Sequence, residues 1–150
     1  MSSCTKEDNK LTIEEVLTSQ IWVIDSYGIK DGTHDPDHET AEYENLMEPC
    51  HSKLLLSFLD DGTFVQNIND ECIDYNMYEE YAIWEYNEFK HYDDCKKIIN
   101  FLTADSLDFQ FYCINTYSKN TIELYQKRTH YPSEWKSVVT ITLIPFKEVQ

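Results

Sequence analysis

The residues of this sequence with the most specific chemistry are its five cysteines, at positions 4, 50, 72, 95 and 113. No two of them form a C-x-x-C pair, so their spacing does not favour a zinc ribbon or a thioredoxin-like redox site. Setting aside Cys4, which lies in a polar N-terminal segment, leaves an even number of cysteines, as is usual in an oxidising compartment. We therefore ask whether Cys50, Cys72, Cys95 and Cys113 pair.

The positions of two predicted hairpin turns suggest which cysteines meet. A three-residue turn at 60–62 places Cys50 opposite Cys72, and a turn at 103–105 places Cys95 opposite Cys113. Opposed residues of antiparallel strands have Cα atoms about 4.5 to 5.5 Å apart, which is within disulfide reach. Alternatives remain, because four cysteines allow three pairings and a free thiol such as Cys113 also suits an apolar core.

A second group of candidate ligands lies in one acidic segment and comprises His34, Asp35, Asp37, His38 and Glu39. An EF-hand needs oxygen ligands at alternate positions, a central Gly and a closing Glu, and the segment lacks this order. Pro36 also keeps the two histidines from sharing a helical face. We expect a solvated acidic loop, with no bound metal or other cofactor.

Motifs of catalysis are not found in the sequence. It has no nucleophile elbow, no H-E-x-x-H and no glycine-rich phosphate loop. Scattered carboxylates offer pairs at glycosidase spacing by chance alone, namely Asp60, Asp61, Glu79, Glu80, Glu85 and Glu88. We expect a protein that is not an enzyme.

The net charge of −16 is unevenly distributed along the 150 residues. Residues 31–89 carry sixteen Asp and Glu against the single base Lys53, whereas residues 90–150 are nearly balanced. Such a field disfavours nucleic acid and anionic lipid surfaces and favours cations, basic proteins or simple solubility. We expect no nucleic-acid partner.

The elements that position these residues are organised around a hairpin at 53–68. Leu54, Leu56 and Phe58 alternate with their neighbours before Asp60-Asp61-Gly62, and apolar residues alternate again after it. Asp-Gly between alternating runs predicts a β-hairpin, with a loop of either two residues or three.

The other elements follow from capping and alternation. Thr12 and Glu15 match a capping box that opens a short helix. Further strands are predicted at 20–29, 81–88, 95–102, 107–114, 121–126 and 135–146, with Leu107, Phe109, Phe111 and Cys113 sharing one face. Long loops cover 30–52 and 69–80, and Thr40 to Met47 has the composition of one or two helical turns before Pro49.

About eight strands with short antiparallel connections predict an all-β fold. A closed barrel is favoured over an open sheet, because closing the meander removes two apolar edge strands. We expect an antiparallel up-and-down barrel with a short N-terminal helix. Residues 11–150 form this single domain. Residues 1–10 precede it as a polar tether.

The N-terminal segment resembles a lipoprotein tether. Ser2-Ser3-Cys4 is similar to the end of a bacterial lipobox, with Cys4 as the lipidated residue, and Lys6-Glu7-Asp8 resembles the surface-export signal of Bacteroidetes lipoproteins. We expect that an initiating Met has replaced the leader, so that a lipid on Cys4 is the membrane attachment of the native protein. This implies a bacterial outer-membrane lipoprotein at the cell surface or in the periplasm.

Three features recur along the predicted strands: Ile21-Trp22, the run from Leu56 to Phe64 that contains F-x-x-D-G-T-F, and Ala82-Ile-Trp-Glu85. Through these features residues 11–146 resemble the bacterial lipocalin-like domain of small Bacteroidetes lipoproteins. Gln20 departs from the family, since lipocalins have the Gly of G-x-W there. The resemblance implies a barrel with one mouth closed by the helix and the other opened by the loops.

Two functions remain open for such a barrel. One is a carrier of a small hydrophobic or glycan ligand, and the other is a protein or glycan interaction module whose barrel is filled by side chains such as Trp22, Trp84, Phe109 and Phe111. We expect a monomer. The candidate ligand-binding residues are Tyr43, Met47, Tyr75, Met77, Tyr78, Tyr81, Trp84 and Tyr86.

Overall fold

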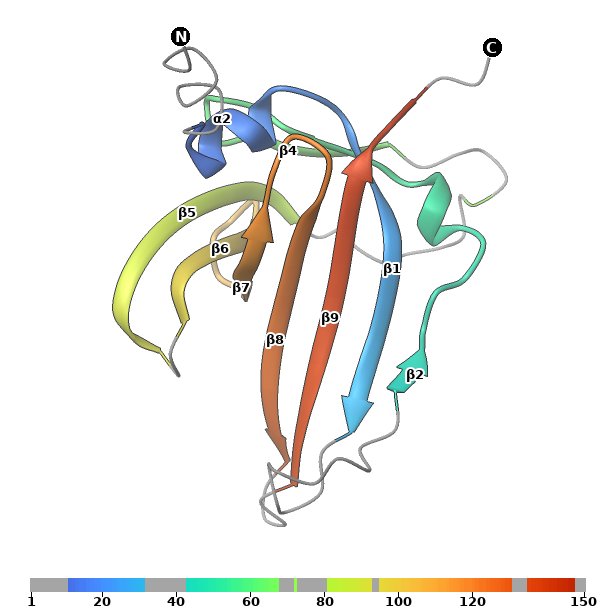
Figure 1. Ribbon diagram of the computed structural model, residues 1–150. Coiled ribbons are helices and arrows are strands. Elements are labelled where there is room, and N and C mark those ends of the chain that lie inside the picture. The colour runs from blue at the N-terminus through green and yellow to red at the C-terminus, as the bar shows by residue number, and fades with distance from the viewer. Residues whose placement is uncertain are drawn as a thin grey trace, which may run out of the picture.

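The computed structural model of the chain describes residues 11–31, 43–67, 72, 81–92, 95–130 and 135–147. It confirms the all-β prediction (Figure 1). In chain order the elements are α2 (Ile13–Thr18), β1 (Trp22–Asp31), β2 (Tyr43–Asn45), the 3-10 turn η1 (His51–Lys53), β3 (Leu55–Phe58), β4 (Phe64–Asn67), β5 (Tyr81–Tyr92), β6 (Cys95–Thr103), β7 (Phe109–Tyr117), β8 (Ile122–His130) and β9 (Trp135–Pro145).

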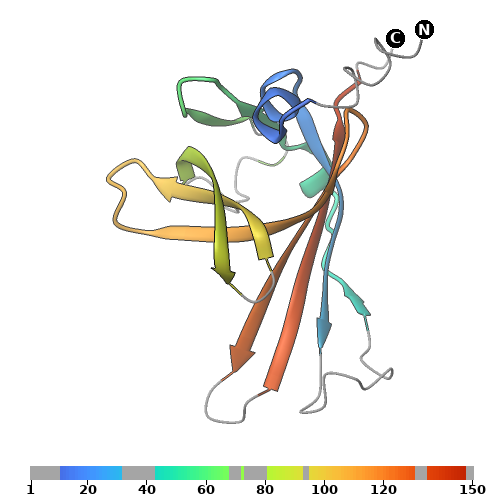
Figure 2. The same cartoon turned by 60° about the vertical axis from the view of Figure 1, so that its left-hand side comes forward.

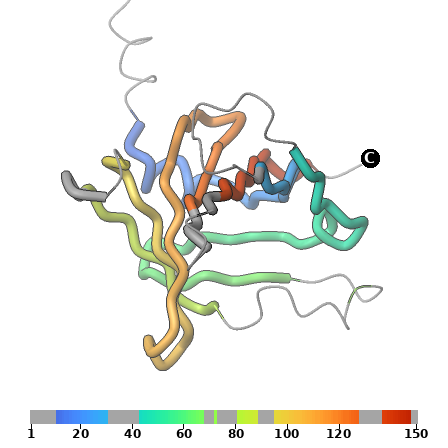
Figure 3. The backbone as a smooth tube through the Cα atoms, turned by 90° about the horizontal axis from the view of Figure 1, so that it is seen from below, coloured from blue at the N-terminus to red at the C-terminus, as the bar shows by residue number. Residues whose placement is uncertain are grey.

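All the strands belong to one antiparallel sheet with the order β4-β3-β1-β9-β8-β7-β6-β5. β3 pairs with β4, and from β5 to β9 each strand pairs with the next one along the chain, as in an up-and-down meander. The first strand, β1, pairs with the last, β9, through nine residue pairs. The sheet curves round so that β5 and β6, drawn in yellow, stand apart from β1 and β9, drawn in blue and red (Figure 3). The fold is therefore the nearly closed eight-strand barrel that the sequence predicts.

Contacts between β4 and β5 bring the two ends of the sheet together. Thr63 forms an isolated antiparallel bridge with Ile83. The backbone N–H of Trp84 donates to the carbonyl of Gly62 at 3.0 Å, and its indole Nε1 donates to the carbonyl of Leu59 at 2.8 Å. These bonds satisfy edge groups that an open sheet would expose to other chains.

The helix α2 lies across one end of the barrel (Figure 1). Thr12 and Glu15 form the predicted capping box, and the apolar face of the helix is buried through Ile13, Val16 and Leu17. The indole Nε1 of Trp22, whose side chain is fully buried, donates to the carbonyl of Leu17 at 3.1 Å. This bond joins the helix to the first residue of β1.

The strand β1 contains a bulge at Asp25. Ile24 lies opposite Leu143 and Ser26 opposite Thr142, which leaves Asp25 without a ladder partner on β9. The extra residue reverses the alternation, so Tyr27 and Ile29 pack against the barrel core in place of Ser26. A regular in-and-out alternation therefore holds only for the first half of this strand.

The short strand β2 was not predicted. Tyr43 to Asn45 pairs with Lys30 to Gly28, so the expected helical turns at Thr40 to Met47 are wrong for these residues. At the N-terminal end of β1, Trp22 pairs with Leu56 of β3. Together β2 and β3 line the same edge of β1, so one strand position of the barrel is occupied by two short strands.

The first hairpin turns as predicted. Leu55–Asn67 and Phe58–Phe64 are opposed pairs, the backbone N–H of Leu59 donates to the carbonyl of Thr63, and Asp60-Asp61-Gly62 is a three-residue loop. Gly62 has φ +93°, a value that glycine adopts without steric cost.

The predicted register of the second hairpin is wrong. Leu102 lies opposite Phe109, and the turn covers residues 104–107 rather than 103–105. Asp105 organises this wider turn by accepting hydrogen bonds from the hydroxyl of Thr103 at 2.6 Å and the N–H of Leu107 at 3.0 Å. Ser106 adopts a positive φ of 61°, so the turn closes without a glycine.

The face of β7 predicted to fill the barrel lies outside it. Tyr112 and Ile114 belong to the barrel core, whereas Phe111 and Cys113 belong to a separate outer cluster with Cys95, Ile98 and Tyr125. Phe109 and Leu107 are 59% and 79% exposed. The prediction that Phe109 and Phe111 fill the interior is therefore wrong.

In the described part of the chain, no helix is long and apolar enough to cross a membrane. The expected tether at 1–10, with Cys4, lies outside the described residues.

Candidate functional site

A continuous group of aromatic rings fills the barrel interior. Phe58 stands at its centre, with ring centroids 5.0 Å from Phe64, 5.6 Å from Trp84 and 6.1 Å from Phe101. Phe101 also lies 6.0 Å from Tyr112 on β7. Ring pairs at these separations and tilts are favourable, so their side chains pack β3 and β4 against β5 and β6 where the two ends of the sheet meet.

The space that remains in the interior is small. A cavity of about 40 Å³ is lined by Ile24, Leu56, Phe58, Phe64, Tyr81, Phe101, Gln110, Tyr112, Leu124, Ile141 and Leu143. Pockets that bind organic ligands usually measure about 300 to 1,000 Å³. The cavity formed by the described residues is too small to enclose a ligand of that size.

A polar layer lies at the helix end of the barrel. The hydroxyl of Tyr86 donates to Glu88 at 2.8 Å, and the ammonium of Lys97 lies 4.9 Å from the centre of the Tyr117 ring. Burial, followed by the hydrogen bond to Glu88, raises the pKa of Tyr86 well above its usual value. Tyr86 is therefore a neutral donor that holds Glu88.

The candidate ligand-binding residues that the structure describes do not form one rim. Tyr43 is 54% exposed on β2, whereas Met47 packs half-buried against the core. Tyr81 lines the cavity, Trp84 is buried beneath the first hairpin, and Tyr86 lies at the helix end. Tyr75, Met77 and Tyr78 lie outside the described residues, as does the acidic segment from His34 to Glu39.

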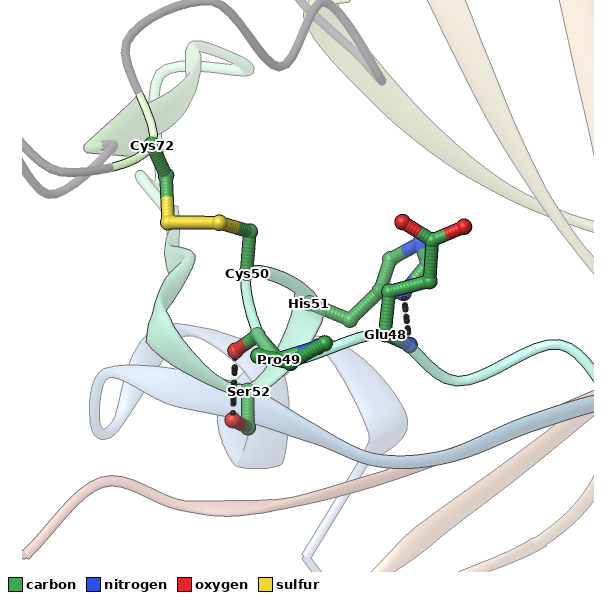
Figure 4. The surroundings of a disulfide bond; sticks show 6 residues. All are labelled: Glu48, Pro49, Cys50, His51, Ser52 and Cys72. Carbon is green, nitrogen blue, oxygen red and sulfur yellow. Dashed lines mark hydrogen bonds between the residues drawn. A yellow bond between two sulfur atoms is a disulfide. The ribbon is translucent and has the colours of Figure 1, made fainter.

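The first predicted disulfide, Cys50–Cys72, is present (Figure 4). Cys50 precedes η1, and its Cα lies 5.7 Å from that of Cys72. The bond lies beyond the last ladder pair of the first hairpin, Leu55–Asn67, and so fastens the chain on either side of that hairpin.

Next to this disulfide, His51 is buried within a tight turn (Figure 4). Its Nδ1 accepts a hydrogen bond from the backbone N–H of Glu48 at 2.7 Å, and its ring meets Tyr27 edge-on at 5.2 Å. Burial lowers the pKa of His51, although Glu48 opposes the shift. A proton on Nδ1 would displace the Glu48 bond, so the turn needs neutral histidine.

The second predicted disulfide, Cys95–Cys113, is also present, with Cα atoms 5.7 Å apart. The reason given for it was wrong, because Cys113 lies opposite Ile98 in the ladder and not opposite Cys95. Both sulfurs lie in the outer cluster, where Phe111 and Tyr125 cover them. The bond therefore supports the outer surface of β6 and β7.

Sequence reasoning missed a groove outside the barrel. Its volume is about 580 Å³, and its lining residues are Val23, Ser52, Asn120, Ile144, Pro145, Phe146 and Lys147. Val23 and Ile144 are opposed on β1 and β9, which explains the apolar floor. Alternation along β1 and β9 could have indicated the outward apolar positions. It could not have indicated that Ser52 of η1 and Asn120 of the β7–β8 turn lie beside them, because these residues are distant in the sequence.

Searches for related proteins add no functional assignment. No protein-family model matches the sequence, and no curated protein matches it either. In the described segments, no three His, Cys, Asp or Glu side chains gather as a metal site would require. The geometry of the barrel and its outer surface is therefore what bears on function.

Proposed function

We propose that this chain is a non-catalytic binding protein whose filled barrel serves as a scaffold for a recognition surface on its outside. The observation that carries this proposal is the interior volume of about 40 Å³, small against the 300 Å³ or more expected of an enclosed ligand site. The ring contacts of Phe58 give the reason, since the interior is occupied by side chains. The partner class is a protein or a glycan.

The proposed location is outside the cytosol, as a lipoprotein attached through Cys4. Two disulfides support an oxidising compartment, because cytosolic thiols are kept reduced. Mass spectrometry of the protein isolated from the cells that make it natively tests the attachment. An acylated N-terminal Cys4 is expected, and a chain that keeps Met1 and an unmodified Cys4 contradicts it.

Titration of the full chain with N-phenyl-1-naphthylamine, an uncharged apolar fluorophore, tests the filled barrel. We expect no saturable one-to-one binding at micromolar concentrations, because the probe is larger than the interior cavity. Saturable binding accompanied by quenching of the buried Trp22 and Trp84 would support the carrier function instead.

A further inference from the structure

The outer surface of the barrel carries an apolar row where three strands meet. Ile83 of β5 lies opposite Leu102 of β6, and Leu102 lies opposite Phe109 of β7. These side chains point outward, because the next residue along each strand, Trp84, Phe101 or Gln110, lines or fills the interior. Outward positions of a solvated barrel are usually polar, so this row needs a separate explanation.

The row is exposed at Phe109, half-buried at Ile83 and Leu102, and continues into the β6–β7 turn. Phe109 is 59% and Leu107 is 79% exposed, more than the other large apolar side chains of the described residues. The turn projects beyond the neighbouring strands in both views (Figures 2 and 3). We call Ile83, Leu102, Leu107 and Phe109 the β6–β7 face. Exposed apolar patches with a polar rim are typical of interaction sites.

The β6–β7 face has a rigid foundation. Immediately along the same outer surface lies the buried cluster of Cys95, Ile98, Cys113, Phe111 and Tyr125, which the disulfide Cys95–Cys113 crosslinks. In the turn itself, Asp105 accepts from both Thr103 and Leu107. A surface held in this way loses little conformational entropy on binding.

The rim of the β6–β7 face is acidic. Asp105, Asp108 and Glu85 are exposed, and hydrogen bonds from Thr103 and Leu107 lower the pKa of Asp105. Glu85 follows Ile83 by two residues and shares its outward face. The basic residues of β6, Lys96 and Lys97, lie toward the opposite end of that strand from Leu102.

We infer that the β6–β7 face docks a basic segment of a partner protein, with an apolar side chain against Phe109 and lysines or arginines facing the acidic rim. The inference rests on the proposed binding function and assigns its surface and partner chemistry. Charge complementarity favours this occupant. A second copy of this chain would bring an equally acidic rim against the first, and its own charge is −16.

The experiment selects binders to the full chain from a display library of random linear peptides and then measures synthetic copies of the enriched sequences. We expect enriched peptides to carry Lys or Arg around an aromatic or aliphatic residue. Phe109→Ser should weaken their binding about thirtyfold, the loss typical of a central anchor. Ile21→Ser is the matched control, because Ile21 is also an exposed large apolar side chain but lies just before β1, and it should change affinity less than about twofold.

Charge has its own matched pair of variants. Asp108→Asn should slow association and flatten its salt dependence, whereas Asp25→Asn, on β1, removes the same charge with little effect. A scrambled peptide of equal charge separates docking from general attraction to an acidic protein. Leu107→Ser, in the exposed turn, replaces Phe109→Ser if that variant does not fold.

The inference would be overturned by a selection that enriches no peptides or enriches acidic ones, or by equal peptide affinity for wild type and Phe109→Ser. It would also be overturned if the face served another occupant, as shown by a dimer that Phe109→Ser abolishes or by binding to a glycan panel that requires Phe109. None of these results depends on the fluorophore titration. Loss of the docking surface and loss of the filled-barrel function are therefore distinguishable.

Discussion

The ring of Tyr43 occupies the space that a Cβ atom on Gly28 would fill. Tyr43 begins the short strand β2, and Gly28 lies on the outward face of β1. The hydroxyl end of the side chain therefore packs against bare backbone, while the residue remains half exposed. This contact explains why a glycine stands in the middle of a long central strand, where it is otherwise unfavourable.

A double-mutant cycle tests this contact. Gly28→Ala should lower the free energy of unfolding by about 1 kcal/mol, because the new methyl group pushes the Tyr43 ring away. In a Tyr43→Ala background the same change should stabilise by about 0.5 to 1 kcal/mol, since alanine is preferred to glycine within a strand. Urea denaturation measures all four chains. The same sign in both backgrounds would show that the ring does not require Gly28.

The two disulfides should differ in their response to limiting reductant. Cys50 is partly exposed, whereas both sulfurs of Cys95–Cys113 belong to buried residues. A thiolate must reach the bond it attacks, so Cys50 and Cys72 should be alkylated first in a time course followed by mass spectrometry. Removal of either disulfide by a double Cys→Ser substitution should lower the free energy of unfolding by about 3 kcal/mol. Earlier alkylation of Cys95 and Cys113 would contradict this order.

Protonation of His51 should destabilise the fold as the pH falls. Its folded-state pKa lies below the ordinary value of 6.5, so the unfolded chain takes up the proton first. The stabilisation is present above pH 6.5 and is lost as the pH drops from there through the folded-state pKa. His51→Gln keeps an acceptor for the Glu48 N–H but does not titrate.

Urea midpoints measured from about pH 7.5 to pH 5 should therefore fall more steeply for the wild type than for His51→Gln. The other four histidines are common to both chains, so the difference between the curves belongs to His51. Parallel curves would mean that His51 does not contribute to the pH dependence of stability.

Phe58→Ala should convert the filled interior into a binding cavity. The lost ring contacts and the new cavity should cost about 3 to 5 kcal/mol of stability. Benzene should then raise the melting temperature of the variant and leave the wild type unchanged, because apolar cavities of sufficient size bind such molecules. Leu59→Ala, at the exposed residue next to Phe58, is a control that should neither lose this much stability nor gain stability from benzene. Stabilisation of the wild type by benzene would mean that its interior already has room.

Local signals predicted the parts of the fold that depend on neighbouring residues. The capping box of α2 and the Asp60-Asp61-Gly62 turn each involve residues within a few positions of one another, so their chemistry is readable in the sequence. The second hairpin has no such marker. Its turn is closed by the side chain of Asp105 and by the positive φ of Ser106, which composition alone does not indicate.

Alternation failed where both faces of a strand are apolar. On β7 the more apolar face, with Phe109 and Phe111, was predicted to be the core, but Tyr112 and Ile114 of the other face are the core residues, and only the neighbouring strands decide which set faces inward. The same ambiguity hid the candidate site. The outward row of Ile83, Leu102 and Phe109 exists only once three strands are in register.

The bulge at Asp25 has a consequence for comparing this chain with others. Without Asp25, Ile24 would be followed directly by Ser26, and the ladder with Leu143, Thr142 and Ile141 would run unbroken. A relative with a one-residue gap at this position would keep the inward side chains of β1 in place. In an alignment, such a gap would mark a straightened strand and leave the barrel's interior composition unchanged.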